Sequence, residues 1–164
     1  MADQRMSMEV LDYLWRAYQE NPNLAHDISP VCAKNLLDPV AASRELRLEG
    51  LIKDDVTIEG SEVRCAVSMK GVISLDKQFV EEKIDGVLSG LREVNSIGNV
   101  MEILNLGAKD FQLAFDLANE MQNRDLVKLL YAFQPGNKVN VEMTLEGVRR
   151  RGSRPTAPSG LTAT

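Results

Sequence analysis

The sequence predicts a mostly helical α+β protein in which one small unit, built of helices and a β-hairpin, occurs twice. The unit is recognised by repetition. Residues within 45–53 recur 75 positions later, and residues 67–72 recur 76 positions later, with aliphatic, hydroxyl and Gly-Val positions in the same order. Apolar residues at helical spacing predict the helices, and two pairs of β-rich runs around Gly-containing turns predict the hairpins.

The repeat also predicts how the 164 residues are divided. We expect a first domain over 1–75, a second over 76–151 and a tail over 152–164. A unit of about 75 residues is near the size at which a lone core is marginal, so the two domains should pack together. Gly, Ser, Pro, Thr and Ala dominate the tail, which buries too little apolar area to fold and is predicted to be disordered.

Composition and charge narrow the class of protein. A hydrophobic content of 44% and a charged content of 26% are typical of a soluble globular chain. No apolar stretch approaches the ~20 residues of a membrane span, and the start lacks a signal peptide's apolar segment, so we expect a cytoplasmic protein with no membrane contact. The net charge of −5 is uneven: residues 1–148 carry 15 bases and 24 acids, a charge of −9.

Three helices are predicted in the first repeat. Each has a start signal, which is a polar N-cap residue alone or a cap followed by proline at the first helical position. In chain order they are 8–19 after the candidate cap Ser7, a short helix after Ser29 that begins with Pro30, and a helix after Asp38-Pro39 that runs to about Glu49 and stops at Gly50.

A hairpin follows, with strands over 56–58 and 63–67 around a Gly-containing turn. The order of three helices and a hairpin, together with Leu46, Glu49-Gly50-Leu51-Ile52 and Val67-Ser68-Met69-Lys70-Gly71, resembles the winged-helix superfamily. The resemblance covers residues 8–75. It implies a helix-turn-helix with a β-hairpin wing, so the chain as a whole is expected to be two tandem winged helices.

The second repeat is predicted to contain comparable elements in a less regular register. Asp125 stands where the first repeat has Gly50, and the first two helices of the repeats do not align at a constant offset. In chain order the elements are a helix capped by Asp76 that reaches Val94, a short helix from a Ser96 cap to Leu104, a helix over 108–124, and a hairpin of 126–133 and 139–143 around the turn 134–137.

Catalytic and metal-binding chemistry is sparse. The single histidine, His26, lies in a loop with no sequence reason to meet a nucleophile, and its spacing to Asp27 and Cys32 fits no recurring zinc pattern. Cys32 and Cys65 sit in apolar settings typical of reduced core thiols. Phosphate-binding glycine loops are absent. We therefore expect no enzyme activity, no metal and no cofactor.

The third helix is the face that a winged helix ordinarily offers to a ligand. When positions are counted back from Gly50 at helical spacing, the outward residues of this helix include two small apolar residues and two arginines. Further bases lie nearby. The candidate binding face is Val40, Ala41, Arg44, Arg47, Lys53, Arg64 and Lys70. The matching outward residues of the second repeat are Phe115, Asp116 and Asn119.

A second candidate is the basic stretch near the C-terminus, where arginines occur without any acid. Its members are Arg149, Arg150, Arg151 and Arg154. The stretch is either an unstructured solubilising tail or an electrostatic anchor for an acidic partner.

Two functions remain open. A DNA-binding transcriptional regulator is the commonest use of a winged helix, but a duplex binder typically neutralises about 6–10 phosphates, and the candidate face offers five bases flanked by acids. The small apolar surface at Val40 and Ala41 and the acidic wing suit a protein partner better. The sequence therefore favours a non-enzymatic adaptor. A homodimer is also possible through the apolar stripe of 76–94, which could equally pack the two repeats together.

Overall fold

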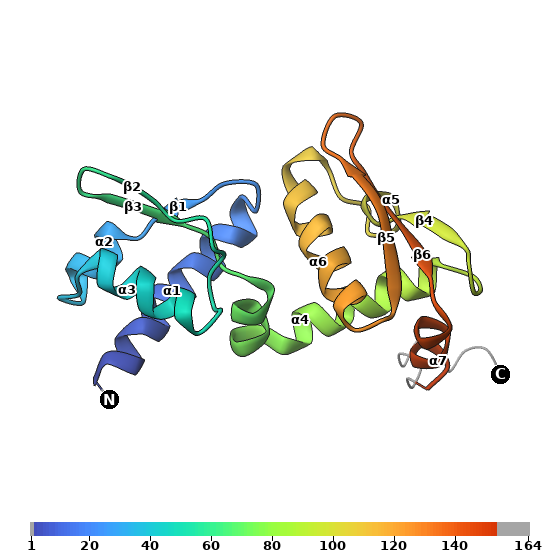
Figure 1. Cartoon of the computed structure of the whole chain (residues 1–164), viewed down its shortest axis with the longest axis horizontal. Coiled ribbons are helices and arrows are strands. Elements are labelled where there is room, and N and C mark those ends of the chain that lie inside the picture. Colours follow the sequence, from blue (N-terminus) through green and yellow to red (C-terminus); the bar gives the residue numbers. More distant parts are fainter. Residues whose placement is uncertain (1, 154–164) are drawn as a thin grey trace.

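The computed structural model describes residues 2–153 and shows an α+β protein, mostly helical, with two small antiparallel sheets. The molecule has two lobes joined by one long helix (Figure 1). We call residues 2–65 the first lobe and residues 77–153 the second lobe. None of the described helices is both long and apolar enough to cross a lipid bilayer.

The first lobe contains three helices and three short strands. In chain order they are α1 (Ala2–Glu20), β1 (His26–Asp27), α2 (Ser29–Lys34), α3 (Pro39–Leu48), β2 (Thr57–Glu59) and β3 (Glu62–Cys65). The joining helix is α4 (Met69–Gly90). The second lobe adds β4 (Ile97–Asn99), α5 (Val100–Ile103), the 3-10 turn η1 (Ala108–Asp110), α6 (Phe111–Asn123), β5 (Val127–Phe133), β6 (Lys138–Met143) and α7 (Leu145–Ser153).

The two sheets share one topology. Their strand orders are β1-β3-β2 and β4-β6-β5, so in each lobe the last hairpin strand lies in the centre. The likeness extends to single hydrogen bonds. Asp27 accepts from the amides of Ser29 and Val63 at 3.0 and 3.1 Å, and Asn99 accepts from the amides of Met101 and Val139 at 3.1 and 3.0 Å.

The strongest likeness lies where each hairpin enters the next helix. The Ser68 hydroxyl donates to the Gly50 carbonyl at 2.6 Å and accepts from the Gly71 amide. Thr144 does the same between Asp125 and Gly147. A β-carbon on Gly71 would lie 2.2 Å from the Leu51 carbonyl oxygen, and one on Gly147 would lie 2.3 Å from that of Leu126. Because no side chain fits there, both repeats need glycine at this step.

The register differences between the repeats come from two places. The bond from the Leu37 amide to the Cys32 carbonyl matches the bond from Leu106 to Met101, both 2.8 Å, so helix α5 corresponds to a shortened α2. The third helix is longer in the second repeat, because η1 is added and α6 has 13 residues where α3 has 10. A constant offset therefore could not have aligned these helices.

Most predicted elements are found, with corrections at their starts. Asp38 caps α3 by accepting from the Ala41 amide, as expected. Ser7 does not cap the first helix, because α1 begins at Ala2 and Ser7 is buried within it. Ser96 does not cap α5 either, since Asn99 accepts from the Met101 amide and residues 97–99 form a strand.

Helix α4 connects the lobes and bends at Asp76, whose backbone is not helical (φ −149°, ψ 72°). Asp76 accepts from the Phe79 amide at 3.1 Å and so caps the second part of the helix, as predicted. The predicted domain boundary at 75 and 76 falls at this bend. The apolar stripe that the sequence offered for dimerisation is buried within the chain itself from Val80 to Leu91. The helix ends at Gly90, short of the expected Val94, which is 39% exposed.

Helix α7 replaces part of the expected tail. Arg149, Arg150 and Arg151 lie within it, so they are not an unstructured basic segment. Arg150 pairs with Glu81 and Asp85, and Arg151 donates to the Leu91 carbonyl. Arg154 and the rest of the predicted tail lie outside the described residues.

These pairs belong to a partly buried charge network between α4, α6 and α7. Arg124 contacts Glu81 at 2.8 Å and Glu120 at 2.7 Å. Burial alone would raise the pKa of Glu81, but hydrogen bonds from Arg150 and Arg124 outweigh it and lower the pKa to about 2. The network therefore fixes α7 to the joining helix.

We expect Gly71→Ala and Gly147→Ala each to lower the free energy of unfolding by about 1–3 kcal/mol, because the added methyl group meets a carbonyl oxygen. Urea denaturation measures the change. The control is Gly107→Ala, since φ there is −91° and no atom lies within 4 Å of the added carbon. An equal loss of unfolding free energy in Gly107→Ala and Gly71→Ala would contradict the requirement for glycine where the hairpin enters the next helix.

Glu81 should make stability depend on acid pH. Its folded pKa of about 2 lies below the usual 4.5, so its stabilisation is complete above pH 4.5 and is lost as pH falls toward 2. Glu81→Gln should cost on the order of 3 kcal/mol at neutral pH and flatten the stability profile across that window. Thermal unfolding between these pH values tests this, with the exposed Glu82→Gln as the control. Equal profiles for the two variants would refute the assignment.

Candidate functional site

The first lobe carries an open cleft between α3 and the hairpin strand β2. Its volume is about 320 Å³. We call it the α3–β2 cleft, and its lining is Val40, Ser43, Arg44, Arg47, Leu48, Val56 and Ile58. Leu48 is 83% exposed and Ile58 is 53% exposed, large values for apolar side chains on either side of one hollow.

The cleft arises from the pleat of the hairpin. Ile58 pairs with the buried Val63, so its side chain lies on the inner side of the sheet, where α3 packs. Val56 precedes it by two residues and shares that side. Three of the predicted face residues, Val40, Arg44 and Arg47, line the opposite wall. Ala41 is exposed but does not line the cleft.

The other predicted bases are engaged elsewhere. The Lys53 ammonium lies 2.7 Å from the Asp116 carboxylate, and the Arg64 guanidinium lies 3.0 Å from Glu62. Lys70 donates to the Glu49 carbonyl at 2.8 Å. Within the cleft, Arg47 makes only a loose contact of 3.9 Å with Asp54. Arg44 takes part in none of the ion pairs of the described residues.

The matching helix of the second lobe, α6, is not available in the same way. Its outward residue Asp116 accepts from the Tyr18 hydroxyl at 2.9 Å, from Lys53 at 2.7 Å and from Gln112 at 2.9 Å. Tyr18 and Lys53 belong to the first half of the chain. The face of α6 that corresponds to the α3 face is thus covered at Asp116 by the chain's own first lobe.

Neighbouring bonds strengthen this contact. Burial and the adjacent Asp116 raise the pKa of Tyr18 far above its ordinary value, so the hydroxyl stays protonated and donates. Asn23 accepts from the Gln112 amide at 2.9 Å and donates to the Ala108 carbonyl at 3.0 Å. Beside the contact, Phe115 and Asn119 line a wider cleft of about 620 Å³ between the lobes.

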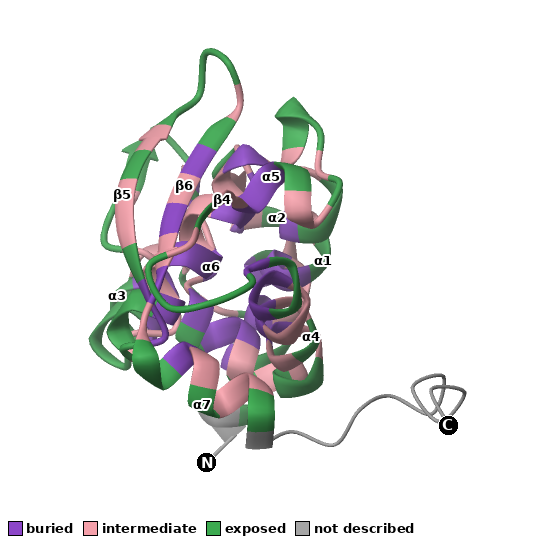
Figure 2. Ribbon diagram, turned by 90° about the vertical axis from the view of Figure 1, so that its right-hand side faces the viewer, coloured by how far each residue is buried: buried purple, intermediate pink, exposed green. Residues whose placement is uncertain are grey.

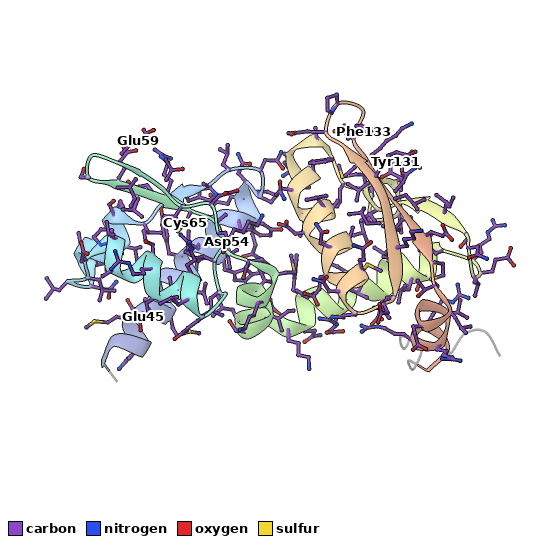
Figure 3. The ribbon with its side chains drawn as sticks, viewed as in Figure 1. Glu45, Asp54, Glu59, Cys65, Tyr131 and Phe133 are labelled. Carbon is purple, nitrogen blue, oxygen red and sulfur yellow. The ribbon has the colours of Figure 1, made fainter. Side chains whose placement is uncertain are left out.

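The β2–β3 hairpin of the first lobe carries acidic side chains. Glu59 lies opposite Glu62 near the tip of this hairpin (Figure 3). Asp54, in the loop before β2, has a side chain that is 95% exposed. The arginines of the α3–β2 cleft lie among carboxylates.

The cysteines and the histidine are not arranged for catalysis. Cys32 and Cys65 are buried, and burial raises the pKa of the two thiols to about 11 and about 12. Both therefore stay protonated at neutral pH, a poor state for a nucleophile. The His26 Nε2 atom lies 3.2 Å from the Asn21 carbonyl oxygen. The described residues contain no group of three or more His, Cys, Asp or Glu side chains suited to a metal.

Sequence reasoning missed the apolar half of the cleft. Val56 and Ile58 were predicted as strand residues. Their spacing of two also indicates that the two side chains lie on the same side of the hairpin, a signal that was not used. Leu48 follows Arg47 near the end of α3 and escaped notice for another reason. Its exposure depends on the position of the hairpin, which helical periodicity does not reveal.

We expect Asp116→Ala to lower the free energy of unfolding by about 1–3 kcal/mol, because it leaves Lys53 and the buried Tyr18 hydroxyl without their acceptor. A double-mutant cycle with Lys53→Met should give a coupling of at least about 0.5 kcal/mol. The exposed Asp55→Ala is the control. Equal effects of Asp116→Ala and Asp55→Ala, or zero coupling, would argue against a contact that holds the lobes.

Comparison with known proteins gives no relative from which a site could be transferred. No protein-family model, curated protein or solved structure matches this chain. The open α3–β2 cleft and the contact of Asp116 with the first lobe are the features of this chain that bear on its function.

Proposed function

We propose that this protein is a non-enzymatic adaptor that binds a protein partner through the α3–β2 cleft. The observation that carries the proposal is the pairing of exposed apolar side chains with arginine in one hollow. Leu48 and Ile58 offer apolar contact, and Arg44 and Arg47 lie beside them. Exposed apolar surface bordered by charge is typical of protein-binding sites.

The lining suggests the chemistry of the partner. A cleft of about 320 Å³ accepts a few side chains, not a folded domain, so we infer that a short segment inserts apolar residues between α3 and β2. A carboxylate on that segment would face Arg44, which can bind it through two parallel N–H bonds. The repulsion of Glu59 and Asp54 would disfavour a segment that is acidic along its whole length.

We also propose that each lobe is a winged helix, on the basis of the shared strand order and the helices that precede each hairpin. DNA binding, the common use of that fold, is the weaker alternative. Lys53, Arg64 and Lys70 are already engaged, and Asp116 on the α6 face is covered by the first lobe. One chain then offers two cleft arginines, against about 6–10 phosphates for a typical duplex binder.

Substitutions that add or reverse a charge in the cleft test the proposal. Tagged wild-type protein should retain a specific partner from native lysate, and Leu48→Asp, Ile58→Asp and Arg44→Glu should each weaken its binding about tenfold or more once it is purified. Calorimetric titration measures the affinity. The control is Leu36→Asp, which changes a side chain that is 92% exposed and outside the cleft.

The same proteins separate the adaptor from the DNA-binding alternative. The adaptor proposal expects no binding to random duplex DNA with a steep dependence on salt. Tight salt-dependent binding that Arg44→Glu abolishes would favour the regulator. Partner binding that survives both Leu48→Asp and Ile58→Asp would show that the cleft is not the binding site.

A further inference from the structure

The second lobe presents an exposed sheet face that its own fold does not cover. The sheet lies on the side of α6 away from the first lobe (Figure 1), and β5, β6 and β4 lie side by side there (Figure 2). We call it the outer sheet face. It carries Ile97, Lys128, Tyr131, Phe133, Lys138 and Glu142. Val139, Val141 and Met143 alternate with the outer residues of β6 and are buried on the inner side.

Aromatic side chains dominate one edge of this face. Tyr131 is 41% exposed and Phe133 is 58% exposed, and their ring centroids are 5.4 Å apart. Both lie on the β5–β6 hairpin of the second lobe, whereas the acidic Glu59 lies on the hairpin of the first lobe (Figure 3). Tyrosine and phenylalanine are enriched where proteins bind one another. In the centre of the face, the side-chain oxygen of Asn140 is buried without a hydrogen-bond donor among the described residues.

Strand pairing places these residues in three rows across the sheet. Glu142 lies between Ile97 and Lys128 in the first row. Asn140 lies beside Tyr131 in the second row, and Lys138 lies beside Phe133 in the third. Opposite charges therefore stand at equal distances on either side of the row that contains Asn140.

That arrangement matches itself under a two-fold rotation. We infer that the outer sheet face binds the same face of a second molecule of this chain, about an axis that runs across the strands through the Asn140 row. Glu142 of each molecule then lies over Lys138 of the other. Lys128 lies over the other Phe133 ring, a favourable cation–π arrangement. The Asn140 row lies on the axis, so each Tyr131, whose hydroxyl accepts from the Asn140 amide at 2.5 Å, faces the Tyr131 of the other molecule.

The first sheet shows that this pattern is not required by the fold. Its outer residues are Thr57, Glu59, Glu62 and Arg64, with Asp27 on β1. It has no aromatic ring, and Glu59 is opposite Glu62. Two such faces would repel one another. The self-complementary charges and the aromatic pair belong to the second repeat alone.

The structure of the edge strand β5 also favours association through the sheet face. The Leu129 amide is bonded to the Gln122 side chain at 2.8 Å, and a bulge interrupts the pairing between Leu129 and Tyr131. A side-chain cap and a bulge both hinder the addition of a further strand. The second molecule is therefore expected over the face and not along the edge.

The size of the face limits the affinity. The three strands have three, seven and six residues. With a rise of about 3.3 Å per residue and a spacing of about 4.8 Å between strands, they cover on the order of 250 Å² per molecule. Stable interfaces bury about 1,200–2,000 Å² in total. We therefore expect a weak, concentration-dependent dimer. The α3–β2 clefts would lie at its two far ends, so the dimer could engage two partner segments.

Sedimentation equilibrium of the full chain over a wide concentration range measures this association. The mean mass should rise from that of the 18.2 kDa monomer toward twice that value. Lys138→Glu and Glu142→Lys should each weaken the dimer about tenfold, because each reversal replaces two attractions by two repulsions. The double reversal should restore the affinity. Phe133→Ser should weaken the dimer by a similar factor.

The controls keep this inference separate from the proposed adaptor function. Arg44→Glu, in the α3–β2 cleft, should leave dimerisation unchanged, and thermal unfolding checks that each variant is folded. A mean mass that stays monomeric at every concentration would overturn the inference. So would a dimer indifferent to Lys138→Glu and Glu142→Lys, or a double reversal that fails to restore the single losses.

Discussion

The carboxylate of Asp116 is the interaction on which the arrangement of the two lobes depends. It gathers Tyr18 and Lys53 from the first half of the chain onto the outward side of α6. A partly buried carboxylate with several donors is stable only while those donors stay in place. The orientation of the lobes therefore decides which of the two corresponding helices, α3 or α6, has its outward face exposed. The α6 face is covered at Asp116, and the α3–β2 cleft is left to solvent.

The two lobes share a strand order and differ in their surfaces. The shared part is the joint between hairpin and helix, where Gly71 and Gly147 pass close to a carbonyl oxygen. The surfaces around that joint have diverged. In the first repeat Ala41 occupies the position of Asp116, so nothing there could make the contact that α6 makes. The outer sheet faces differ as well, with carboxylates on one and aromatic rings on the other.

Much of this fold could be predicted from the sequence because its signals are local. Asp38-Pro39 sets the start of α3, and the glycine turns set the hairpins, since caps and turns act over a few residues. The strands β1 and β4 escaped prediction, because two or three residues hold no periodicity. Their existence depends on pairing with β3 and β6, far along the chain.

The candidate site was harder to predict for the same reason. The arginines of α3 were found from helical geometry, and the cleft beside them is made by a strand that packs from elsewhere. The partner of Lys53 was equally invisible, since Asp116 is 63 residues away in sequence. Arg150 was assigned to a tail because composition alone does not reveal its pairing with Glu81.

The unequal helices of the two repeats carry a consequence for how the chain acquires its structure. Tandem units of similar sequence are prone to exchange equivalent segments while folding, which traps them in misassembled forms. Here α5 is shorter than α2, and α6 with η1 is longer than α3. A hairpin from one repeat would meet helices of the wrong length in the other. The different helix lengths of the two repeats thus disfavour the exchange of hairpins between them, and each hairpin packs on the helices of its own repeat.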